Sequence, residues 1–301
     1  MIARRVAGIA GLLSLVAGCV APSGREQAPA PQPQATPMTQ PPARPIVSMR
    51  PVEFTVEGAL EQGGWIRGTV PEGTISATLG DQPLSFARDG SFFAGIDRDS
   101  PATLVLEATT NDQLLATRTL RIAPRDWRIE RVNAPLRGSV PSETFMAIRR
   151  PELAQINTAR AVRSQTDGWR QRFIWPVKGR ISGRFGAQRI YQGVPGSYHS
   201  GLDIAPGAGV AYVAPADGVV VLAASKPFSL EGNLVIIDHG MGLNSAFLHS
   251  SRLAVQEGDR VKQGQTIGYV GATGRATGPH LHWSLKWQDA RLDPLLFLPP
   301  Q

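Results

Sequence analysis

The sequence predicts a mainly β protein with two β-rich domains, and three features support this prediction. Glycine and proline are abundant, at 32 and 25 of 301 residues, whereas aromatic residues make up only 7%. Short stretches alternate between apolar and polar residues with a period of two, which is typical of half-buried strands. Turn-forming residues separate these stretches at short intervals. A chain of this length can bury the core of one large domain or of two modest ones.

The first nineteen residues have the pattern of an export signal. Two arginines precede an apolar stretch that is too short to cross a membrane comfortably as a permanent anchor. Residues 16–19 (VAGC) resemble the lipobox at which bacterial lipoproteins are cleaved and acylated on the new N-terminal cysteine. We therefore expect residues 1–19 to be a lipoprotein signal peptide and Cys19 to be the lipidated residue. The alternative is a plain signal peptide that contains a cysteine by chance.

Export sets the expected location and the expected partners. Cys19 is the only cysteine, so no disulfide framework is expected. Val20 follows it where an aspartate would resemble an inner-membrane retention signal, so we expect a lipid anchor in the outer membrane and a folded part in the periplasm. The formal charge of +7 would suit nucleic acid, which an exported protein rarely meets, so none is expected. A basic surface also suits carboxylate-rich peptides or anionic lipid, or serves solubility alone.

Residues 20–46 read as a linker. They are rich in proline, glutamine and alanine and contain almost no large apolar residue, so they cannot bury a core. Proline-rich chains stay extended, at roughly 3 Å per residue. We expect this segment to hold the folded part away from the lipid anchor at Cys19.

Residues 47–124 are expected to form a small antiparallel β-sandwich of immunoglobulin-like type, because six alternating stretches are separated by turn formers. An accessory, positioning or wall-binding role and a role as a plain spacer are equally favoured by this pattern. The stretches are residues 52–56, 64–70, 74–79, 91–96, 103–108 and 114–122.

Residues 125–172 form a basic connector in which we expect a helix. Apolar residues recur at helical spacing after Pro151, which suits the first turn of a helix, and Gly168 would end it. Packing against the next domain is the preferred role for this segment. Residues 173–301 then return to glycine-punctuated strands and form the second β domain, which holds all five histidines of the chain.

Two histidine motifs in this second domain indicate a metal site. His199 and Asp203 are four residues apart, and Gly201 between them can supply the bend that brings both side chains to one ion. His280 and His282 flank Leu281, so on a strand they point to the same face. One of them can bind the ion while the other stands over an open coordination position, and the spacing does not tell which. A solvated pair at a strand edge is the alternative.

Taken together, these motifs resemble the LytM and lysostaphin-type zinc metallopeptidases, which cleave peptidoglycan. The resemblance rests on His199-x-x-x-Asp203, on His249 in the sequence FLHSS, on residues 255–274 and on TGPHLHW, and it runs from Trp175 to Phe297. It implies a peptidase domain of the duplicated hybrid motif type. It also implies that His199, Asp203 and His282 bind zinc, and that His249 and His280 act on the water and on the developing oxyanion.

The resemblance predicts a zinc metalloendopeptidase that hydrolyses peptide crosslinks of peptidoglycan. Two histidines and one carboxylate leave a coordination position open, as in catalytic sites, where zinc lowers the pKa of bound water towards ~7. The alternatives are a non-catalytic LytM-type protein that binds wall material and activates a separate amidase, and an adhesive lipoprotein. A non-catalytic relative would lack some of the metal-binding residues, whereas all five expected positions are filled here.

Three further residues or segments complete the expectations. His239 ends an apolar strand and is expected to be structural. Phe247 stands where the family often has a tyrosine, which removes a hydroxyl near the substrate. The stretch before His199, residues 189–198, is longer than in the simplest members and is expected to influence specificity through Tyr191 or Tyr198.

Overall fold

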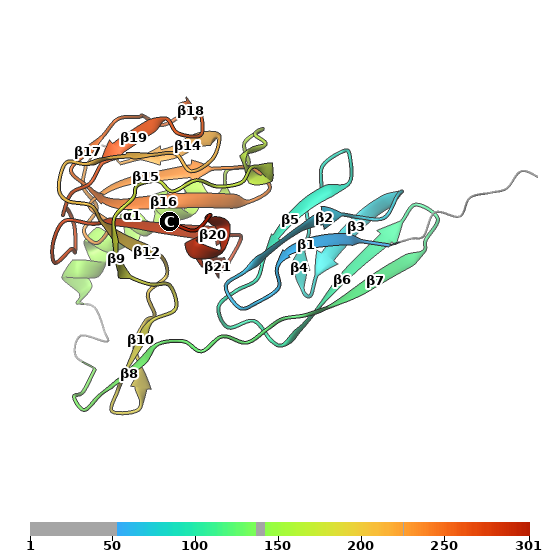
Figure 1. The fold of residues 1–301 in the computed structure, drawn as a ribbon, viewed down its shortest axis with the longest axis horizontal. Helices are drawn as coiled ribbons and strands as arrows, with labels where there is room; N and C mark the ends of the chain where they lie inside the picture. The colour runs from blue at the N-terminus through green and yellow to red at the C-terminus, as the bar shows by residue number, and fades with distance from the viewer. Residues whose placement is uncertain (1–52, 137–141, 225) are drawn as a thin grey trace, which may run out of the picture. The chain divides into compact units, whose positions relative to one another are not determined.

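The computed structural model describes residues 53–136, 142–224 and 226–301, which all belong to one compact unit, residues 50–301 (Figure 1). The expected signal peptide with Cys19 and the expected linker over residues 20–46 lie outside the described residues. Among the residues described, none of the helices has the length and apolar character needed to cross a membrane.

The described chain is mainly β, as predicted. Its N-terminal part contains two antiparallel sheets, one of three strands in the order β1-β2-β5 and one of four in the order β4-β3-β6-β7 (Figure 1). Their buried side chains, among them Phe54, Ile66, Phe92, Leu106 and Leu120, belong to one core. The immunoglobulin-like type of this domain stays a prediction. The strands are β1 (Thr55–Ala59), β2 (Trp65–Thr69), β3 (Thr74–Leu79), β4 (Gln82–Pro83), β5 (Ser91–Gly95), β6 (Thr103–Thr110) and β7 (Leu115–Arg121).

The helix of the connector, α1, spans Glu143–Ala161 and so begins before the expected start at Pro151. The Ser142 side chain accepts a hydrogen bond from the backbone N–H of Phe145, which caps the helix at its true start. Pro151 lies inside the helix, where its missing N–H removes one helical hydrogen bond. The helix ends well before Gly168, because the backbone is already extended at Val162. Proline was therefore a misleading signal for the first turn.

The connector also contains a strand that the sequence analysis did not expect. Strand β8 (Ile129–Val132) pairs in parallel with β10 (Gln188–Tyr191), and β10 pairs with β11 (Val194–Pro195). The long stretch before His199 is therefore a β-hairpin with β8 as its third strand (Figure 1).

The second β domain is built on an eight-stranded sheet in the order β18-β14-β15-β16-β20-β12-β9, with β21 paired to β20. A smaller sheet, in the order β13-β19-β17, accompanies it. The strands of the large sheet are β9 (Arg180–Gly183), β12 (Leu202–Ala205), β14 (Gly218–Ala223), β15 (Asn233–Asp238), β16 (Leu243–Ser250), β18 (Arg260–Val261), β20 (Leu281–Trp287) and β21 (Ala290–Leu292), and those of the small sheet are β13 (Ala211–Val213), β17 (Arg252–Leu253) and β19 (Thr266–Tyr269).

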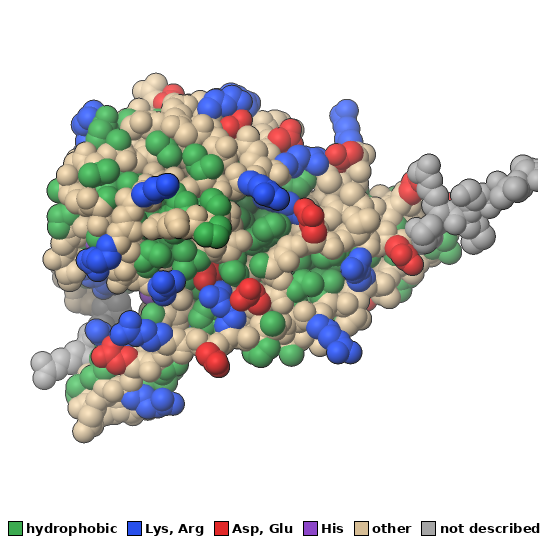
Figure 2. All heavy atoms as spheres, in the orientation of Figure 1, with side chains coloured by type: hydrophobic (Ala, Val, Ile, Leu, Met, Phe, Trp, Pro, Cys, Tyr) green, Lys and Arg blue, Asp and Glu red, His purple; other side chains and the backbone are tan. Residues whose placement is uncertain are grey.

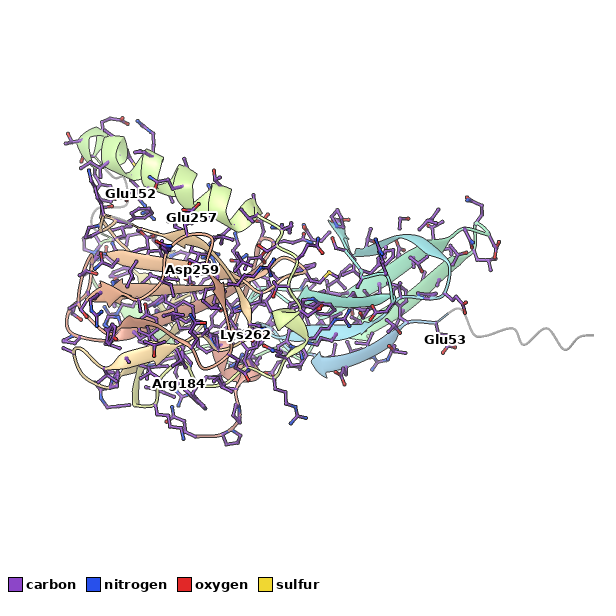
Figure 3. All side chains as sticks on the ribbon, turned by 90° about the horizontal axis from the view of Figure 1, so that it is seen from above. Glu53, Glu152, Arg184, Glu257, Asp259 and Lys262 are labelled. Carbon is purple, nitrogen blue, oxygen red and sulfur yellow. The ribbon has the colours of Figure 1, made fainter. Side chains whose placement is uncertain are left out.

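Both faces of the large sheet are covered. Its central strands are buried on both sides, as expected for strands that lie between two layers. One side packs in the main core around Phe247 and Trp283. The other packs in a second cluster beneath α1, where Ile156 and Ala159 of the helix meet Leu234 and its neighbours. Figure 3 shows α1 lying along this face of the sheet.

The main core continues from the second β domain into the N-terminal sheets. The Trp65 ring stacks on Phe93 at 6.2 Å and lies 5.4 Å from Phe297, which belongs to the short 3-10 helix η2 (Pro294–Phe297). The indole N–H of Trp65 donates to the carbonyl oxygen of Leu296 at 2.9 Å. These contacts hold strand β2 on the C-terminal end of the chain.

Charge on the surface is mixed in sign. Figure 2 shows Lys and Arg side chains spread over the visible face, with Asp and Glu side chains among them. Several of the cations are paired, as in the contacts Arg170–Asp89 at 3.1 Å and Lys262–Asp217 at 2.8 Å. The positive charge of the chain is therefore partly balanced locally.

We predict that Trp65→Ala lowers the free energy of unfolding by about 3 kcal/mol, because it removes a large aromatic contact and strands the carbonyl of Leu296. Chemical denaturation followed by circular dichroism measures this. Ile75→Ala, at a side chain that is 60% exposed in the same domain, is the matched control and should change the free energy by less than about 0.5 kcal/mol. Equal losses in both variants would contradict the packing described here.

Candidate metal centre and active site

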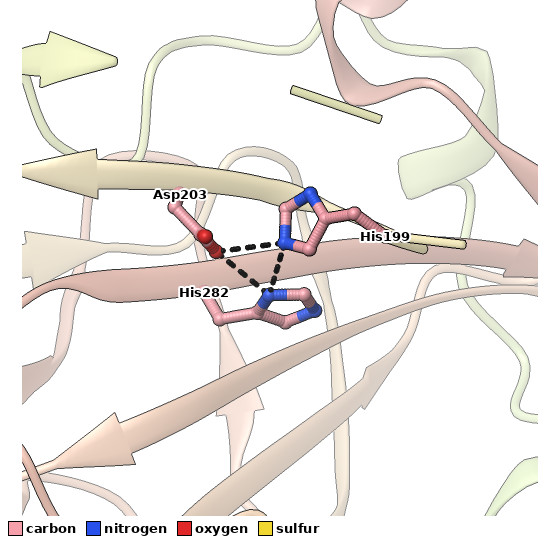
Figure 4. A group of neighbouring side chains, drawn as sticks. All are labelled: His199, Asp203 and His282. Carbon is pink, nitrogen blue, oxygen red and sulfur yellow. Dashed lines mark hydrogen bonds and ion pairs between the residues drawn. The ribbon is translucent and has the colours of Figure 1, made fainter. Parts of the chain in front are cut away.

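Two neighbouring strands bring the candidate ligands together. Strands β12 and β20 pair antiparallel, and Asp203 lies directly opposite His282 in their register. Directly opposite residues on one face have adjacent side chains, at about 4.5–5.5 Å between Cβ atoms. His199 precedes β12 and approaches the same point from the loop (Figure 4). The pairing of β12 and β20 therefore creates the cluster from residues 79 positions apart.

Three ligand atoms of these side chains meet at about the separation that a single ion requires (Figure 4). His199 Nε2 lies 3.0 Å from Asp203 Oδ1 and 3.1 Å from His282 Nδ1, and His282 Nδ1 lies 2.8 Å from Asp203 Oδ1. Atoms at these separations can all lie about 2.0–2.2 Å from one metal ion. Each of the three atoms can direct a lone pair to the point between them. A cation at that point would offset the repulsion between these lone pairs.

The surroundings orient His199 for this task. Its Nδ1 lies 3.0 Å from the carbonyl oxygen of Arg184, to which an Nδ1–H donates. That hydrogen bond leaves the Nε2 lone pair free towards the cluster, as is usual for metal-binding histidines.

Two glycines make the close approach feasible. A Cβ at Gly201 would lie 2.6 Å from His282 Nε2 and 2.6 Å from the carbonyl oxygen of Trp283, and a Cβ at Gly183 would collide with the carboxylate of Asp203. Neither position tolerates a side chain without moving a candidate ligand.

The electrostatics favour a carboxylate between two imidazoles. Burial alone would raise the pKa of Asp203, but hydrogen bonds from His199 and His282 hold it well below its usual range. Burial lowers the pKa of His282, whose side chain is 12% exposed. At His199, 24% exposed, burial acts in the same direction but Asp203 outweighs it and the pKa is raised. The site therefore presents one ionised carboxylate between two imidazoles, a donor set that a single divalent cation fits.

His249 and His280 stand beside this cluster. Their ring centroids are 4.9 Å apart, and His280 Nε2 lies 3.8 Å from Asp203 Oδ1. Each ring has its Nδ1 2.8 Å from a backbone carbonyl oxygen, of Thr273 for His249 and of Gly278 for His280. These bonds assign the proton to Nδ1 and leave both Nε2 atoms free for proton transfer or hydrogen bonding. All five histidine and aspartate positions singled out from the motifs are thus brought together.

The backbone of His249 is unusual. Its φ is 64°, in the left-handed region that residues other than glycine seldom adopt. The register between β15 and β16 shifts at this point, between Asn233 and Val235. Such bulges redirect a side chain. Here the bulge falls at Leu248 and His249 of β16, so it includes the catalytic candidate, and nothing in the local sequence FLHSS indicates it.

His239 and Phe247 are both parts of the core. His239 is fully buried, with Nδ1 2.8 Å from the carbonyl oxygen of Asp217 and Nε2 2.7 Å from the hydroxyl of Ser245, and burial lowers its pKa to about 4. It is neutral and structural at neutral pH. Phe247 is stacked between Tyr212 and Trp283 with no exposed surface, so a tyrosine hydroxyl at this position would point into the core, contrary to the expectation that it would contact substrate.

A groove of about 900 Å³ extends from His199. Its walls include the start of the connector at residues 125–130, the β10–β11 hairpin and Arg275. Tyr191 lines it, and so does Tyr198, whose ring packs on Phe185 at 5.9 Å. The hairpin's place beside the site agrees with the expectation for residues 189–198, whereas the connector's part in the groove has no local sequence signal, because it depends on the parallel pairing of distant segments.

Residues 197–294 match Peptidase family M23. The chain is 40% identical over 116 residues to the peptidoglycan DD-endopeptidase ShyA of Vibrio cholerae, covering 38% of this chain and 26% of that protein. It is 35% identical over 125 residues to the murein hydrolase activator NlpD of Escherichia coli, covering 42% of this chain and 31% of that protein. The chain thus spans about a third or less of the length of these two relatives.

Among solved structures, the fold is similar to a Pseudomonas aeruginosa structure assigned to peptidase M23, with a TM-score of 0.61 and 28% sequence identity. The match covers 79% of this chain and 94% of that one. Because it extends well beyond the matched family segment, it includes more than the second β domain.

We predict that Gly201→Ala weakens divalent-metal binding at least about tenfold, because the added Cβ displaces His282. Titration calorimetry with zinc measures the affinity. Gly278→Ala is the matched control, since a Cβ there meets no atom within 4 Å, and it should bind as the wild type does. Unchanged affinity in Gly201→Ala would contradict the assignment of His282 to the metal centre.

Proposed function

We propose that this protein is a zinc-dependent endopeptidase that hydrolyses peptide crosslinks of peptidoglycan, since residues 197–294 match Peptidase family M23. The observation that supports it most strongly is the gathering of His199, Asp203 and His282 at about 3 Å with two further histidines beside them. Three protein ligands leave a coordination position for water or substrate, as catalytic zinc sites do.

Zinc suits this donor set, because two imidazole nitrogens and one carboxylate oxygen are its common ligands. When bound, the ion would supply Lewis-acid polarisation of the scissile carbonyl and activation of water. His249 and His280 would serve through Nε2, one taking the proton of the attacking water and the other donating a hydrogen bond to the carbonyl oxygen as it gains negative charge.

The groove beside His199 supports an acidic peptide as substrate. Arg125 and Arg189 on its wall are engaged by Asp293 and Glu130, both at 2.8 Å. Three other guanidinium groups of the groove, those of Arg128, Arg184 and Arg275, form no close ion pair with a carboxylate of the described residues, although Arg128 interacts with Glu130 at longer range. Peptidoglycan peptides carry free carboxylates that such groups would bind.

The alternative is a protein that activates another wall hydrolase, which is what the name of the Escherichia coli relative describes. The complete set of five side chains favours an enzyme, because an activator has no need for two histidines with free Nε2 atoms beside a metal site. By the same reasoning, a purely adhesive role leaves the cluster without a purpose.

A place in the cell envelope fits this function, since the substrate is found there. We propose that the chain is exported, lipidated at Cys19 and held by the membrane anchor in the periplasm, with residues 20–46 as linker. Residues 47–124 would then be an immunoglobulin-like accessory domain, residues 125–172 the connector and residues 173–301 the peptidase domain.

We predict that His249→Ala keeps about one bound zinc per chain but releases muropeptides from purified peptidoglycan about 10²–10³ times more slowly, because one proton-transfer or oxyanion partner is lost. His282→Ala should lose both zinc and activity, as should the wild type treated with a chelator. Mass spectrometry of the products and elemental analysis of the protein provide the two readouts. If His282→Ala and the chelator-treated protein release muropeptides at the wild-type rate, the protein is not a zinc-dependent endopeptidase.

We predict that Arg128→Gln raises KM for peptides with free carboxylates about two- to fivefold and leaves kcat unchanged, because an exposed cation contributes modestly to binding. The effect should vanish for the corresponding amidated peptides. Arg121→Gln, at an exposed arginine outside the groove, is the matched control. If the wild type and Arg128→Gln have the same KM for the free peptides and for the amidated peptides, the arginines of the groove do not recognise carboxylates.

A further inference from the structure

Helix α1 carries a buried ion cluster that the proposed reaction does not use. Arg149 and Glu152 are each only 8% exposed, and Glu152 lies on the side of α1 towards the strands (Figure 3). The guanidinium of Arg149 donates to both carboxylate oxygens of Glu231, at 2.6 and 2.7 Å, and to Glu152 at 3.0 Å. Buried ion pairs contribute little net stability compared with apolar packing, so their value lies more often in fixing one geometry.

This cluster holds the loop of residues 228–232 at two places. Glu152 accepts hydrogen bonds from both the backbone N–H and the hydroxyl of Ser229, each at 2.6 Å. Arg149 holds Glu231 two residues further on. With both attachments on one turn of α1, the loop cannot shift unless the helix moves or the cluster breaks.

Backbone carbonyls of the same loop accept hydrogen bonds from two segments of the active site. The carbonyl oxygen of Glu231 accepts the backbone N–H of His249 at 2.8 Å, and that of Leu230 accepts the N–H of Arg275 at 2.9 Å. Arg275 belongs to the glycine-rich stretch that includes Thr273, whose carbonyl oxygen receives the Nδ1–H of His249. The backbone and the ring of His249 are therefore both held by segments that the loop organises.

His249 needs such support, because its left-handed backbone is unfavourable for a side chain with a Cβ. A conformation of this kind persists only where the surroundings impose it. Released from Glu231, the residue would relax towards extended backbone, and its ring would turn away from the cluster of His199, Asp203 and His282.

We propose that α1 is a positioning element of the active site, in which Arg149 and Glu152 hold His249 in its working conformation through the loop of residues 228–232. The inference rests on the proposed function, since it gives His249 a role in hydrolysis. It adds to the site a helix that lies outside the matched family segment and that the sequence analysis treated as a connector.

The test compares the wild-type full-length chain with three variants of it. Arg149→Met combined with Glu231→Gln removes the attachment of Glu231 to the helix without leaving Glu231 as an unpaired buried charge, while Glu152 keeps its hydrogen bonds with Ser229. Arg149→Lys keeps the charge but loses the two-pronged contact. Arg150→Met is the matched control, because Arg150 is the next residue of the helix, has a side chain that is 60% exposed and pairs with the exposed side chain of Glu143.

We predict that the double variant lowers kcat by about ten- to a hundredfold with zinc content and KM nearly unchanged, since misplacing one catalytic group has that effect. Arg149→Lys should recover part of the rate, and Arg150→Met should match the wild type. Hydrogen exchange followed by mass spectrometry should accelerate in peptides that cover residues 228–232 and 246–251 while the N-terminal sheets stay protected. Accelerated exchange throughout the chain would mean a structural role only and would overturn the inference.

If hydrogen exchange at His249 is the same in the double variant as in the wild type, the inference is also overturned. Should the wild type fail to hydrolyse peptidoglycan, the proposed function fails, and the exchange comparison still decides whether α1 holds His249. The two ideas can therefore fail separately.

Discussion

The pairing of β12 with β20 is the contact on which the candidate active site depends. It sets Asp203 opposite His282, so that a carboxylate oxygen and an imidazole nitrogen lie 2.8 Å apart on neighbouring strands of the large sheet. A shift of that register by one residue would turn one of the two side chains to the other face. The glycines at 183 and 201 permit the approach, and the buried layers on both faces of the sheet keep the register in place.

Around this pair, each added histidine has its orientation set by a backbone carbonyl. Arg184, Thr273 and Gly278 supply these carbonyls for His199, His249 and His280 in turn. Backbone acceptors on two loops, one after β9 and one between β19 and β20, leave the Nε2 atom of each ring free. The site is therefore only as ordered as these loops, and this explains why a helix on the far face of the sheet can matter to it through the loop of residues 228–232.

Much of this arrangement could be predicted from local sequence patterns. The period-two alternation located most strands. The two histidine motifs named four of the residues that the structure brings together, and the family resemblance added His249, although their roles remain proposals. Local signals failed where distant segments decide the outcome. Pro151 suggested the start of a helix that Ser142 in fact caps, and the pairing of β8 with β10 joins segments with no common pattern. The left-handed backbone of His249 likewise depends on residues of α1.

The most direct test of the central claim is X-ray absorption spectroscopy of the zinc-loaded full-length chain. The account predicts one zinc per chain in a four-coordinate site, with two imidazoles and one carboxylate at about 2.0–2.2 Å and a light atom in the fourth position. Substoichiometric zinc, or a shell of three or four imidazoles that draws in His249 or His280, would contradict it.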